Sequence, residues 1–310
     1  MRQAFVNTLS ELAAQNPQLL LLTGDLGFKL FDDFRFKYPK QFLNAGVAES
    51  NMMGLAAGLS LEGKSPFVYS IATFLIMRPF EQIRNDICFH NANVKLVGVG
   101  GGFSYGPNGT SHHALNDVAL MRALPEMSVL CPGDPWEARW ALEQAFDHHG
   151  PVYVRLGRGQ DEHVHPARLA LKWGQGILMR EGQDVGIIAS GLMLKTAVDV
   201  ADELQKKGLS VRLVSMPSVK PLDERMVRAT FEQCTAVFTL EEHYSTGGLG
   251  SAVMEWGVRN STDTSKLHCF AVPDITFHDI GSQEYLRRQA GLGVDQIVQH
   301  IAVAPLRRLC

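Results

Sequence analysis

A chain of 310 residues, 45% of them hydrophobic, can bury more than one core, and domain-size priors favour two domains over one. The net charge of −3, with no basic run and no basic amphipathic helix, argues against a protein that binds nucleic acid or a membrane surface. Small-molecule chemistry and protein partners remain as functions.

The N-terminal stretch and the cysteines indicate the compartment. Residues 1–18 alternate apolar and polar side chains at helical spacing, unlike the uninterrupted apolar region of a signal peptide. No segment approaches the roughly 20 apolar residues needed to cross a bilayer. The five cysteines are far apart and lack CxxC spacing, which is typical of reduced thiols. We therefore expect a soluble, cytoplasmic protein.

In the first half of the chain, helical stretches alternate with short apolar runs. A buried strand is predicted to end at Gly24 and Asp25. The other predicted strands are 41–46, 65–70, 94–102 and 150–158, and the predicted helices are 1–16, 51–61 and 78–91. This alternation predicts a parallel sheet with helices on both faces, which is a doubly wound α/β domain.

The pattern stops in a polar, turn-rich stretch at about 158–178 and then restarts. The second series has predicted strands at 184–190, 210–216 and 236–243, and predicted helices at about 195–207 and 223–233. It predicts a second, smaller α/β domain. We therefore divide the chain into residues 1–165 and residues 178–310.

Glu49 is a single carboxylate among small and apolar residues in the stretch 44–63. Small neighbours such as Gly54 and Gly58 would let the helix that follows lie close to another backbone. A carboxylate there would be poorly solvated, which favours its protonated or proton-sharing state and suits proton exchange with a ring nitrogen. On position alone, an ordinary acidic residue at a helix start is the simpler explanation.

A glycine-rich loop, Gly98–His113, follows another predicted strand. Six of its sixteen residues are glycine, so backbone amides could approach a ligand closely, and His112 and His113 supply two titratable imidazoles. The loop matches neither the GxGxxG nor the GxxxxGK[ST] pattern. A flexible loop with two histidines in solvent is the alternative.

Five motifs follow one another along the chain. They are AGVAESNMMGLAAGLSLEG, ATFLIMRPFEQIRND, GPNGTSHHALNDVALMRALPEMSVLCPGD, GPVYVRLGRG and LEEHYSTGGLGSAV. Together they resemble the C-terminal half of transketolase, which is a pyrimidine-binding domain followed by the transketolase C-terminal domain. The resemblance covers essentially the whole chain, and the five motifs in family order are specific where any single one would be weak.

The resemblance implies thiamine diphosphate as the cofactor. It implies that Glu49 shares a proton with the aminopyrimidine ring and promotes its imino tautomer, which agrees with a poorly solvated carboxylate. It also implies that Phe74 stacks on the pyrimidine and that Met77 and Phe80 form further walls of the same site. Without the resemblance, an aromatic residue in an apolar run is more often part of the core.

The resemblance also implies residues for the substrate. His112 lies where the family's GPTH histidine lies, although this chain reads GTSH, and is expected to contact the donor and stabilise developing charge. Adjacent His113 departs from the usual glutamine, so either imidazole could face the cofactor. The other implied substrate residues are Asp25, for which a strand-end turn is the alternative, Asn108, and the arginines Arg2 and Arg158, whose guanidinium groups suit a phosphate.

Two departures from the family pattern fall in the acceptor channel. The family histidine after the strand is Gly100 here, and the aspartate before GPTH is Asn108. We expect from them a substrate other than the ketose and aldose phosphates usual in the family.

The diphosphate-binding half of the family's site is missing from this sequence. The family holds the diphosphate through Mg²⁺ on a GDG motif, and this chain contains no GDG. Split transketolases carry that motif on a separate polypeptide. The resemblance therefore implies an N-terminal partner subunit with the Mg²⁺ ligands, no metal ligands on this chain, and an α2β2 heterotetramer. The small residues of Gly54–Gly58 would lie between unlike subunits, unless they pack inside this domain.

The C-terminal motif, Glu241–Gly250, places glutamates at a strand end and glycines at a helix start. Tight packing, or an anion site at the helix N-terminus, would explain the glycines. The resemblance implies no catalytic residue here. We therefore interpret Glu241, His243 and Gly247–Gly250 as structural.

The predicted function is that of the C-terminal subunit of a thiamine diphosphate-dependent, transketolase-like transferase, which moves a two-carbon ketol unit from a sugar or sugar phosphate to an aldehyde. The enzymatic alternative is a 2-oxoacid dehydrogenase β subunit or an enzyme like deoxyxylulose phosphate synthase. A non-catalytic scaffold or regulator is the alternative of another class. The presence of Glu49, Phe74 and His112 together counts against it.

Overall fold

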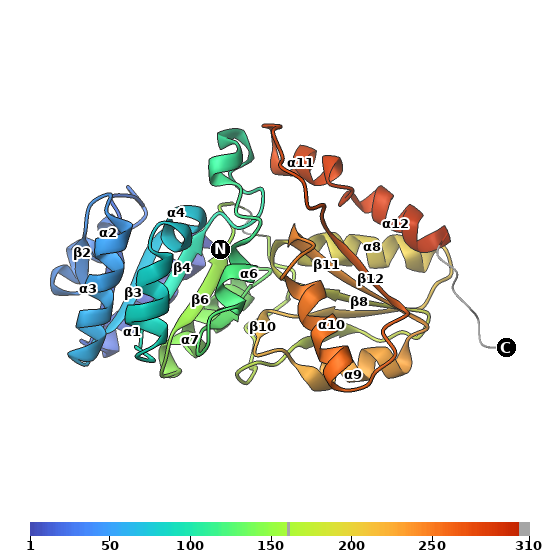
Figure 1. The fold of residues 1–310 in the computed structure, drawn as a ribbon, viewed down its shortest axis with the longest axis horizontal. Helices are drawn as coiled ribbons and strands as arrows, with labels where there is room; N and C mark the ends of the chain where they lie inside the picture. Colours follow the sequence, from blue (N-terminus) through green and yellow to red (C-terminus); the bar gives the residue numbers. More distant parts are fainter. Residues whose placement is uncertain (160–161, 304–310) are drawn as a thin grey trace.

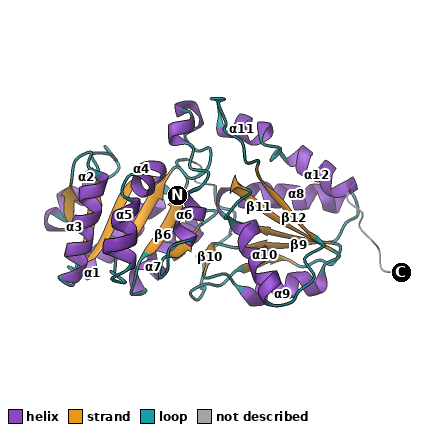
Figure 2. Cartoon of the chain, in the orientation of Figure 1, coloured by secondary structure: helices purple, strands orange, loops and turns teal. Residues whose placement is uncertain are grey.

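The computed structural model describes residues 1–159 and 162–303 and contains two α/β units, each built on one sheet (Figure 1). Figure 2 shows the same arrangement by secondary structure, with strands between layers of helices. The predicted fold class is confirmed. Within the described ranges, no helix is both long and apolar enough to cross a membrane.

The first sheet has seven strands in the order β10-β5-β6-β4-β3-β1-β2. Neighbouring strands are parallel except β10, which runs antiparallel to β5. The strands are β1 (Leu19–Thr23), β2 (Phe42–Asn44), β3 (Ser65–Ile71), β4 (Lys95–Val99), β5 (Ser128–Leu130), β6 (Val152–Leu156) and β10 (Ser218–Lys220). The central strands β4 and β6 are buried along their whole length, as expected for a sheet covered on both faces.

Helices cover both faces of this sheet. Helices α1 (Arg2–Gln15) and α7 (Pro135–Asp147) pack on one face. The other face carries α3 (Glu49–Leu61), α4 (Ala72–Met77), α6 (Asp117–Arg122) and the π-helical turn η2 (Ile83–Cys88). Short helices α2 (Asp32–Lys37) and α5 (Phe80–Gln82) complete the unit. The predicted helix 78–91 begins only at Phe80, because Pro79 has no N–H group to continue α4.

The second sheet has five strands in the order β12-β11-β8-β9-β7, of which only β7 is antiparallel to its neighbour. The strands are β7 (Ile177–Arg180), β8 (Val185–Ala189), β9 (Val211–Ser215), β11 (Ala236–Tyr244) and β12 (Leu267–Val272). One face carries α8 (Leu194–Lys206), α11 (Gln283–Gln289) and α12 (Val294–Val303), and the other carries α9 (Glu224–Gln233) and α10 (Leu249–Arg259).

Strand β10 joins the two units in a way that the sequence did not predict. It belongs to the second series of elements, yet Ser218 pairs with Leu130 at the edge of the first sheet. A strand of three residues has too little periodicity to be recognised, and its partner is distant in sequence. The division into residues 1–165 and 178–310 remains a prediction. Strand β10 lies in the second range of the sequence but belongs to the first sheet.

The parallel strands bring distant segments to one edge of the first sheet. In register, Thr23 pairs with Tyr69, Ile71 with Val99, and Val99 with Leu156. Their carboxyl ends therefore lie side by side. The segments that follow these ends contain Asp25, Phe74, the loop 100–113 and Arg158.

The C-terminal motif forms contacts that agree with a structural role. The carboxylate of Glu241 accepts hydrogen bonds from the backbone N–H groups of Leu249 and Gly250 at 2.7 and 2.8 Å. The helix N-terminus thus binds the chain's own anion. Burial raises the pKa of Glu241 to about 7 although these two N–H groups lower it. A Cβ on Gly248 would lie 2.0 Å from a Glu241 oxygen, which explains a glycine there.

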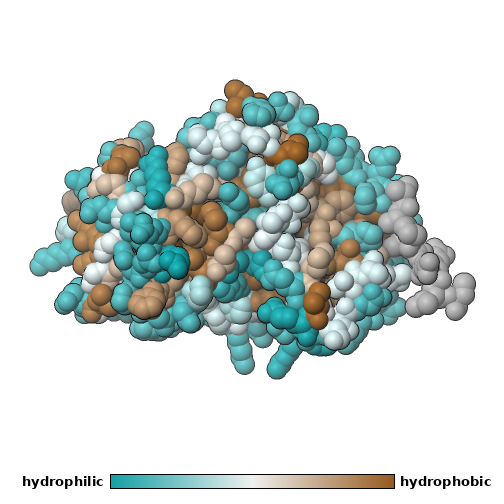
Figure 3. Space-filling model, viewed as in Figure 1, coloured by the Kyte–Doolittle hydropathy of each residue, from teal (hydrophilic) through white to brown (hydrophobic). Residues whose placement is uncertain are grey.

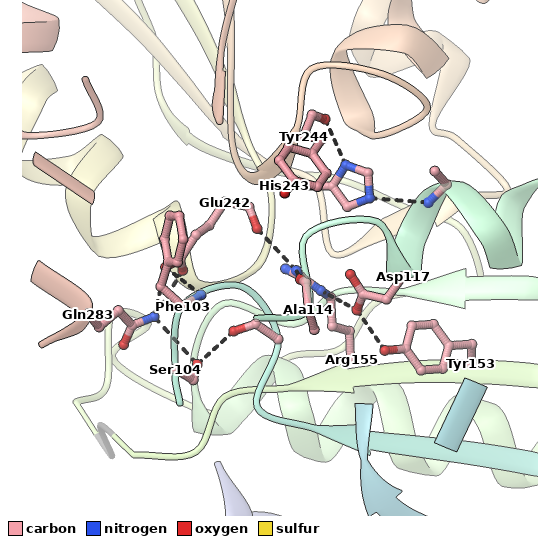
Figure 4. A network of polar contacts seen from close by, with 12 residues as sticks. Phe103, Ser104, Ala114, Asp117, Tyr153, Arg155, Glu242, His243, Tyr244 and Gln283 are labelled. Carbon is pink, nitrogen blue, oxygen red and sulfur yellow. Dashed lines mark hydrogen bonds and ion pairs between the residues drawn. The ribbon is translucent and has the colours of Figure 1, made fainter. Parts of the chain in front are cut away.

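A buried ion pair lies where the two units meet (Figure 4). The Nε atom of Arg155, on β6, donates to Asp117 Oδ2 at 2.7 Å, and the hydroxyl of Tyr153 donates to the same oxygen at 2.7 Å. A second guanidinium nitrogen donates to the carbonyls of Ala114 and Glu242 at 2.6 and 3.0 Å. Burial opposes the charge of Arg155, but Asp117 outweighs it and raises the pKa of the guanidinium above its usual range.

Replacing Asp117 by asparagine keeps the shape of the side chain and leaves the Arg155 charge buried without a counter-ion. We expect a loss of about 3 to 5 kcal/mol in the free energy of unfolding, measured by urea denaturation. The matched control is Asp295→Asn, which removes a carboxylate from the exposed pair with Arg288 and should change stability little. Equal effects of the two substitutions would contradict the assignment.

Candidate functional site

Glu49 is the first residue of α3 and is only 4% exposed. Both of its carboxylate oxygens accept hydrogen bonds from Nη1 of Arg78, at 3.0 and 2.9 Å. The Arg78 side chain itself is 46% exposed. The predicted poor solvation of Glu49 is therefore present, but a cation that the sequence analysis did not consider compensates the buried charge.

Arg78 also covers the aromatic ring of Phe74 on α4. The Arg78 Cζ atom lies 4.1 Å from the centre of that ring. A planar group that hydrogen-bonds to Glu49 and stacks on Phe74 therefore already occupies this place. An aminopyrimidine ring is also planar and has nitrogen atoms at its edge, so it would make the same two kinds of contact. The residues fit the pyrimidine of thiamine diphosphate, provided that the Arg78 guanidinium moves aside.

His112 also contacts the Phe74 ring. Its imidazole meets the ring edge to face, with centroids 5.0 Å apart, and Ser111 Oγ lies 3.0 Å from its Nδ1 atom. Burial lowers the pKa of His112, and His113, Arg158 and Arg78 lower it further. These effects favour the neutral imidazole, which can accept a hydrogen bond or a proton.

His113 points away from this cluster. Its side chain is buried, with Nε2 3.3 Å from the carbonyl oxygen of Gly106 and the ring against the edge of Phe103 at 5.2 Å. Of the two adjacent imidazoles, the structure thus places His112 beside Phe74 and His113 in the interior. The predicted contact of His113 with substrate remains a prediction.

Tyr105 fills the place of the side chain that Gly100 lacks. A Cβ on Gly100 would lie 2.1 Å from two carbons of the Tyr105 ring, and Gly100 has a φ of +88°. The guanidinium carbon of Arg158 lies over this ring, 4.6 Å from its centre, and the centres of the Tyr105 and His112 rings are 5.8 Å apart. Sequence reasoning missed Tyr105. The sequence feature that could have indicated it is an aromatic residue five positions after Gly100, which stands where the family has a histidine.

Arg2 lies close to the same ring. Burial raises the pKa of Tyr69 and of Tyr105, and the charge of Arg2 lowers both, as does that of Arg158 for Tyr105. Within residues 1–159 and 162–303, no ion pair joins Arg2 or Arg158 to a carboxylate. Two guanidinium groups without carboxylate partners beside a tyrosine form a place suited to an anion.

The other predicted residues lie around this cluster. Asp25 is exposed, has a φ of +54°, and accepts a hydrogen bond from the Asn44 side chain at 3.0 Å. Met77 is partly exposed at the end of α4, whereas Phe80 packs against the core on the α3 face. Asn108 is exposed. In the part of the chain that the structure describes, no group of three His, Cys, Asp or Glu side chains is arranged to hold a metal ion.

Comparison with known families accounts for both units. Residues 1–161 match the model "Transketolase, pyrimidine binding domain", and residues 174–297 match "Transketolase, C-terminal domain". The chain belongs to the transketolase family. The sequence resemblance is thereby confirmed, and members of this family depend on thiamine diphosphate.

Individual relatives show which part of a transketolase this chain matches. One of the subunits of an apulose-4-phosphate transketolase from Phocaeicola vulgatus is 36% identical over 82% of both chains. A 1-deoxy-D-xylulose-5-phosphate synthase from Desulforudis audaxviator is 33% identical over 96% of this chain but only 47% of its own length. A solved structure described as a split-gene transketolase, inactive β4 tetramer, superposes with a TM-score of 0.90 at 36% identity over 99% of both chains.

The charge state of His112 can be measured by an NMR titration of its imidazole. We expect a pKa below the ordinary histidine value, because the ring is partly buried among cations. Arg158→Gln should raise this pKa by removing one nearby positive charge. The matched control, Arg259→Gln on α10, should leave it unchanged, and an unshifted pKa in Arg158→Gln would contradict the proximity of Arg158.

Proposed function

We propose that this chain is the C-terminal subunit of a thiamine diphosphate-dependent transketolase, active with an N-terminal subunit, that transfers a two-carbon ketol unit from a ketose to an aldehyde. One observation carries the proposal. Glu49, Phe74 and His112 come from three separate segments, and the fold brings them into one cluster linked by Arg78.

Each residue of the cluster has a role in this proposal. When bound, thiamine diphosphate would supply the electronic stabilisation needed to break and form the carbon–carbon bond. Glu49 exchanges a proton with the pyrimidine ring, and Phe74 stacks on that ring, with Met77 and Phe80 as further walls. Arg78 gives up its contacts with Glu49 and Phe74 to make room.

The substrate lies on the His112 side of the cluster. A neutral imidazole can hydrogen-bond to the donor's carbonyl or hydroxyl groups and accept a proton as charge develops. Arg2 and Arg158 bind an anionic group of the sugar, with Asp25 and Asn108 near its hydroxyls. The relative from Phocaeicola vulgatus is named for a phosphorylated ketose, which supports an anionic substrate. Because Tyr105 replaces the missing side chain at Gly100, we expect a selectivity different from that of common transketolases.

The second half of the site comes from a partner. This sequence has no GDG motif, so we place the diphosphate and Mg²⁺ ligands on an N-terminal subunit in a cytoplasmic α2β2 complex. The inactive β4 assembly of the related split transketolase supports this dependence.

Figure 3 shows hydrophobic side chains among hydrophilic ones on the surface of the first unit. On α3, a Cβ added to Gly54 or Gly58 would meet nothing within 4 Å, and Leu61 is 68% exposed, as expected of a surface that another subunit covers.

The similarity to the synthase from Desulforudis audaxviator favours one second candidate function. That relative is about twice as long as the region matched here, whereas the apulose-4-phosphate transketolase chain is matched over 82% of its length. Transfer of a two-carbon unit from a ketose to an aldehyde would identify the transketolase.

Glu49→Gln tests the catalytic role. Glutamine keeps the size of the side chain but cannot exchange the proton, so we expect turnover of the assembled complex to fall on the order of 100-fold or more. Subunit assembly, followed by sedimentation, should be intact. The matched control is Glu62→Gln at the exposed end of α3. Unchanged turnover in Glu49→Gln would leave a scaffold or regulator as the better function.

Calorimetric titration of thiamine diphosphate with Mg²⁺ tests the division of the site. We expect no tight binding to the chain alone and binding to its mixture with a GDG-containing subunit from the same genome. The mixture should then transfer a two-carbon unit from a ketose. Tight binding by the chain alone would mean that the diphosphate site lies within this chain.

A further inference from the structure

The loop that carries Tyr105 and His112 is held by the second unit. The central residue of this contact is Glu242, which lies on β11 and is only 1% exposed. Its Oε1 atom accepts a hydrogen bond from the backbone N–H of Phe103 at 3.1 Å, inside the loop. Gln283, on α11, donates to its Oε2 atom at 2.9 Å (Figure 4). Arg287, on the same helix, donates to that oxygen at 2.7 Å.

Further contacts with the second unit follow along the same loop. The hydroxyl of Thr110 donates to the carbonyl of Phe277 at 2.7 Å. A Cβ on Gly106 would lie 2.3 Å from the carbonyl oxygen of Gly281, so the two backbones touch. At Gly102, with a φ of +64°, a Cβ would lie 2.6 Å from Cδ of Glu242. The loop therefore meets residues 277–287 and Glu242 at several points between 102 and 110.

The loop needs such a support because of its composition. Five of the ten residues from Gly100 to Gly109 are glycine, which gives the free backbone many conformations to lose. Its hydrogen bonds to the first unit lie at its ends, where Gly100 and Gly101 bond to Leu156, and Gly102 bonds to Ala114. Between these ends, the charged acceptor Glu242 is the strongest kind of partner available to a backbone N–H group.

We propose that Glu242 is a positioning residue for the substrate site, acting through the loop from Phe103 to His112. Its carboxylate joins α11 to the backbone of Phe103, and so holds the Tyr105 ring beside Arg158 and the His112 ring beside Phe74. The second unit then contributes to substrate binding without contacting substrate. The kinetic part of this inference depends on the proposed function, whereas its structural part does not.

Glu242→Gln tests the structural part by hydrogen exchange of the full chain. The amide cannot accept from all three donors, so peptides covering 102–112 should exchange at least tenfold faster, with exchange in α7 and β8 unchanged. The matched control is Glu255→Gln, which removes a carboxylate from another ion pair between the units, with Arg122 at 2.8 Å. Glu255 is 56% exposed and lies outside the loop contacts, so loop exchange should stay within twofold of wild type.

The His112 imidazole gives a second readout that general destabilisation would not move. In a loosened loop the ring becomes more hydrated, so its pKa should rise toward the ordinary histidine value in Glu242→Gln and not in Glu255→Gln. If Glu242→Gln does not fold, two milder variants replace it. Gln283→Ala removes the hydrogen bonds to Glu242 and Ser104, and Thr110→Val removes the one to Phe277, so each should accelerate loop exchange. Unchanged loop exchange in a folded Glu242→Gln, or in both milder variants, overturns the inference.

The assembled complex separates this inference from the proposed function. With ketol transfer present in wild type, Glu242→Gln should raise KM for the ketose about tenfold while thiamine diphosphate affinity, measured by calorimetry, is unchanged. An unchanged KM with normal loop exchange overturns the positioning role alone. If the wild-type complex transfers no ketol unit, the proposed function fails, and loop exchange still decides whether Glu242 holds the loop.

Discussion

The arrangement of the two units depends on the buried guanidinium of Arg155. One cation bonds to the carboxylate of Asp117, to the carbonyl of Ala114 at the end of the glycine-rich loop, and to the carbonyl of Glu242 on β11. A charge taken out of water is costly unless it is paired, so this cation is satisfied only when all three segments are in place. The position of the loop relative to both sheets follows from that requirement.

Buried polar side chains near Arg155 also form hydrogen bonds with the other unit. His243, next to Glu242, donates from Nδ1 to the Tyr244 carbonyl at 2.8 Å and accepts at Nε2 from the N–H of Ala119 at 3.2 Å. Only a neutral imidazole makes both bonds, and burial lowers the pKa of His243 to about 4. Three consecutive residues of β11 thus hold three segments. Glu241 binds the start of α10, Glu242 binds the glycine-rich loop, and His243 binds the first turn of α6. The second unit is a support for the first as well as a domain of its own.

In the candidate site, a single arginine satisfies two groups that a cofactor would otherwise contact. Arg78 neutralises Glu49 and covers Phe74, so neither the carboxylate nor the ring is left without a partner in this chain alone. Because Arg78 is half exposed, little packing holds it there. If the other half of the site belongs to a partner subunit, as proposed, this contact can be exchanged when that subunit and its ligand bind.

The sequence by itself determined the two α/β units, the parallel first sheet and the identity of Glu49, Phe74 and His112 as candidates. Hydrophobic periodicity and ordered motifs are local properties, so they can be read along the chain. The tertiary structure decided what depends on residues far apart in sequence: the pairing of β10 with the first sheet, the partner of Glu49, the inward turn of His113, and Tyr105 in the space beside Gly100. These are contacts between side chains or strands whose meeting no local pattern encodes, because only the packing of the whole chain brings them within reach.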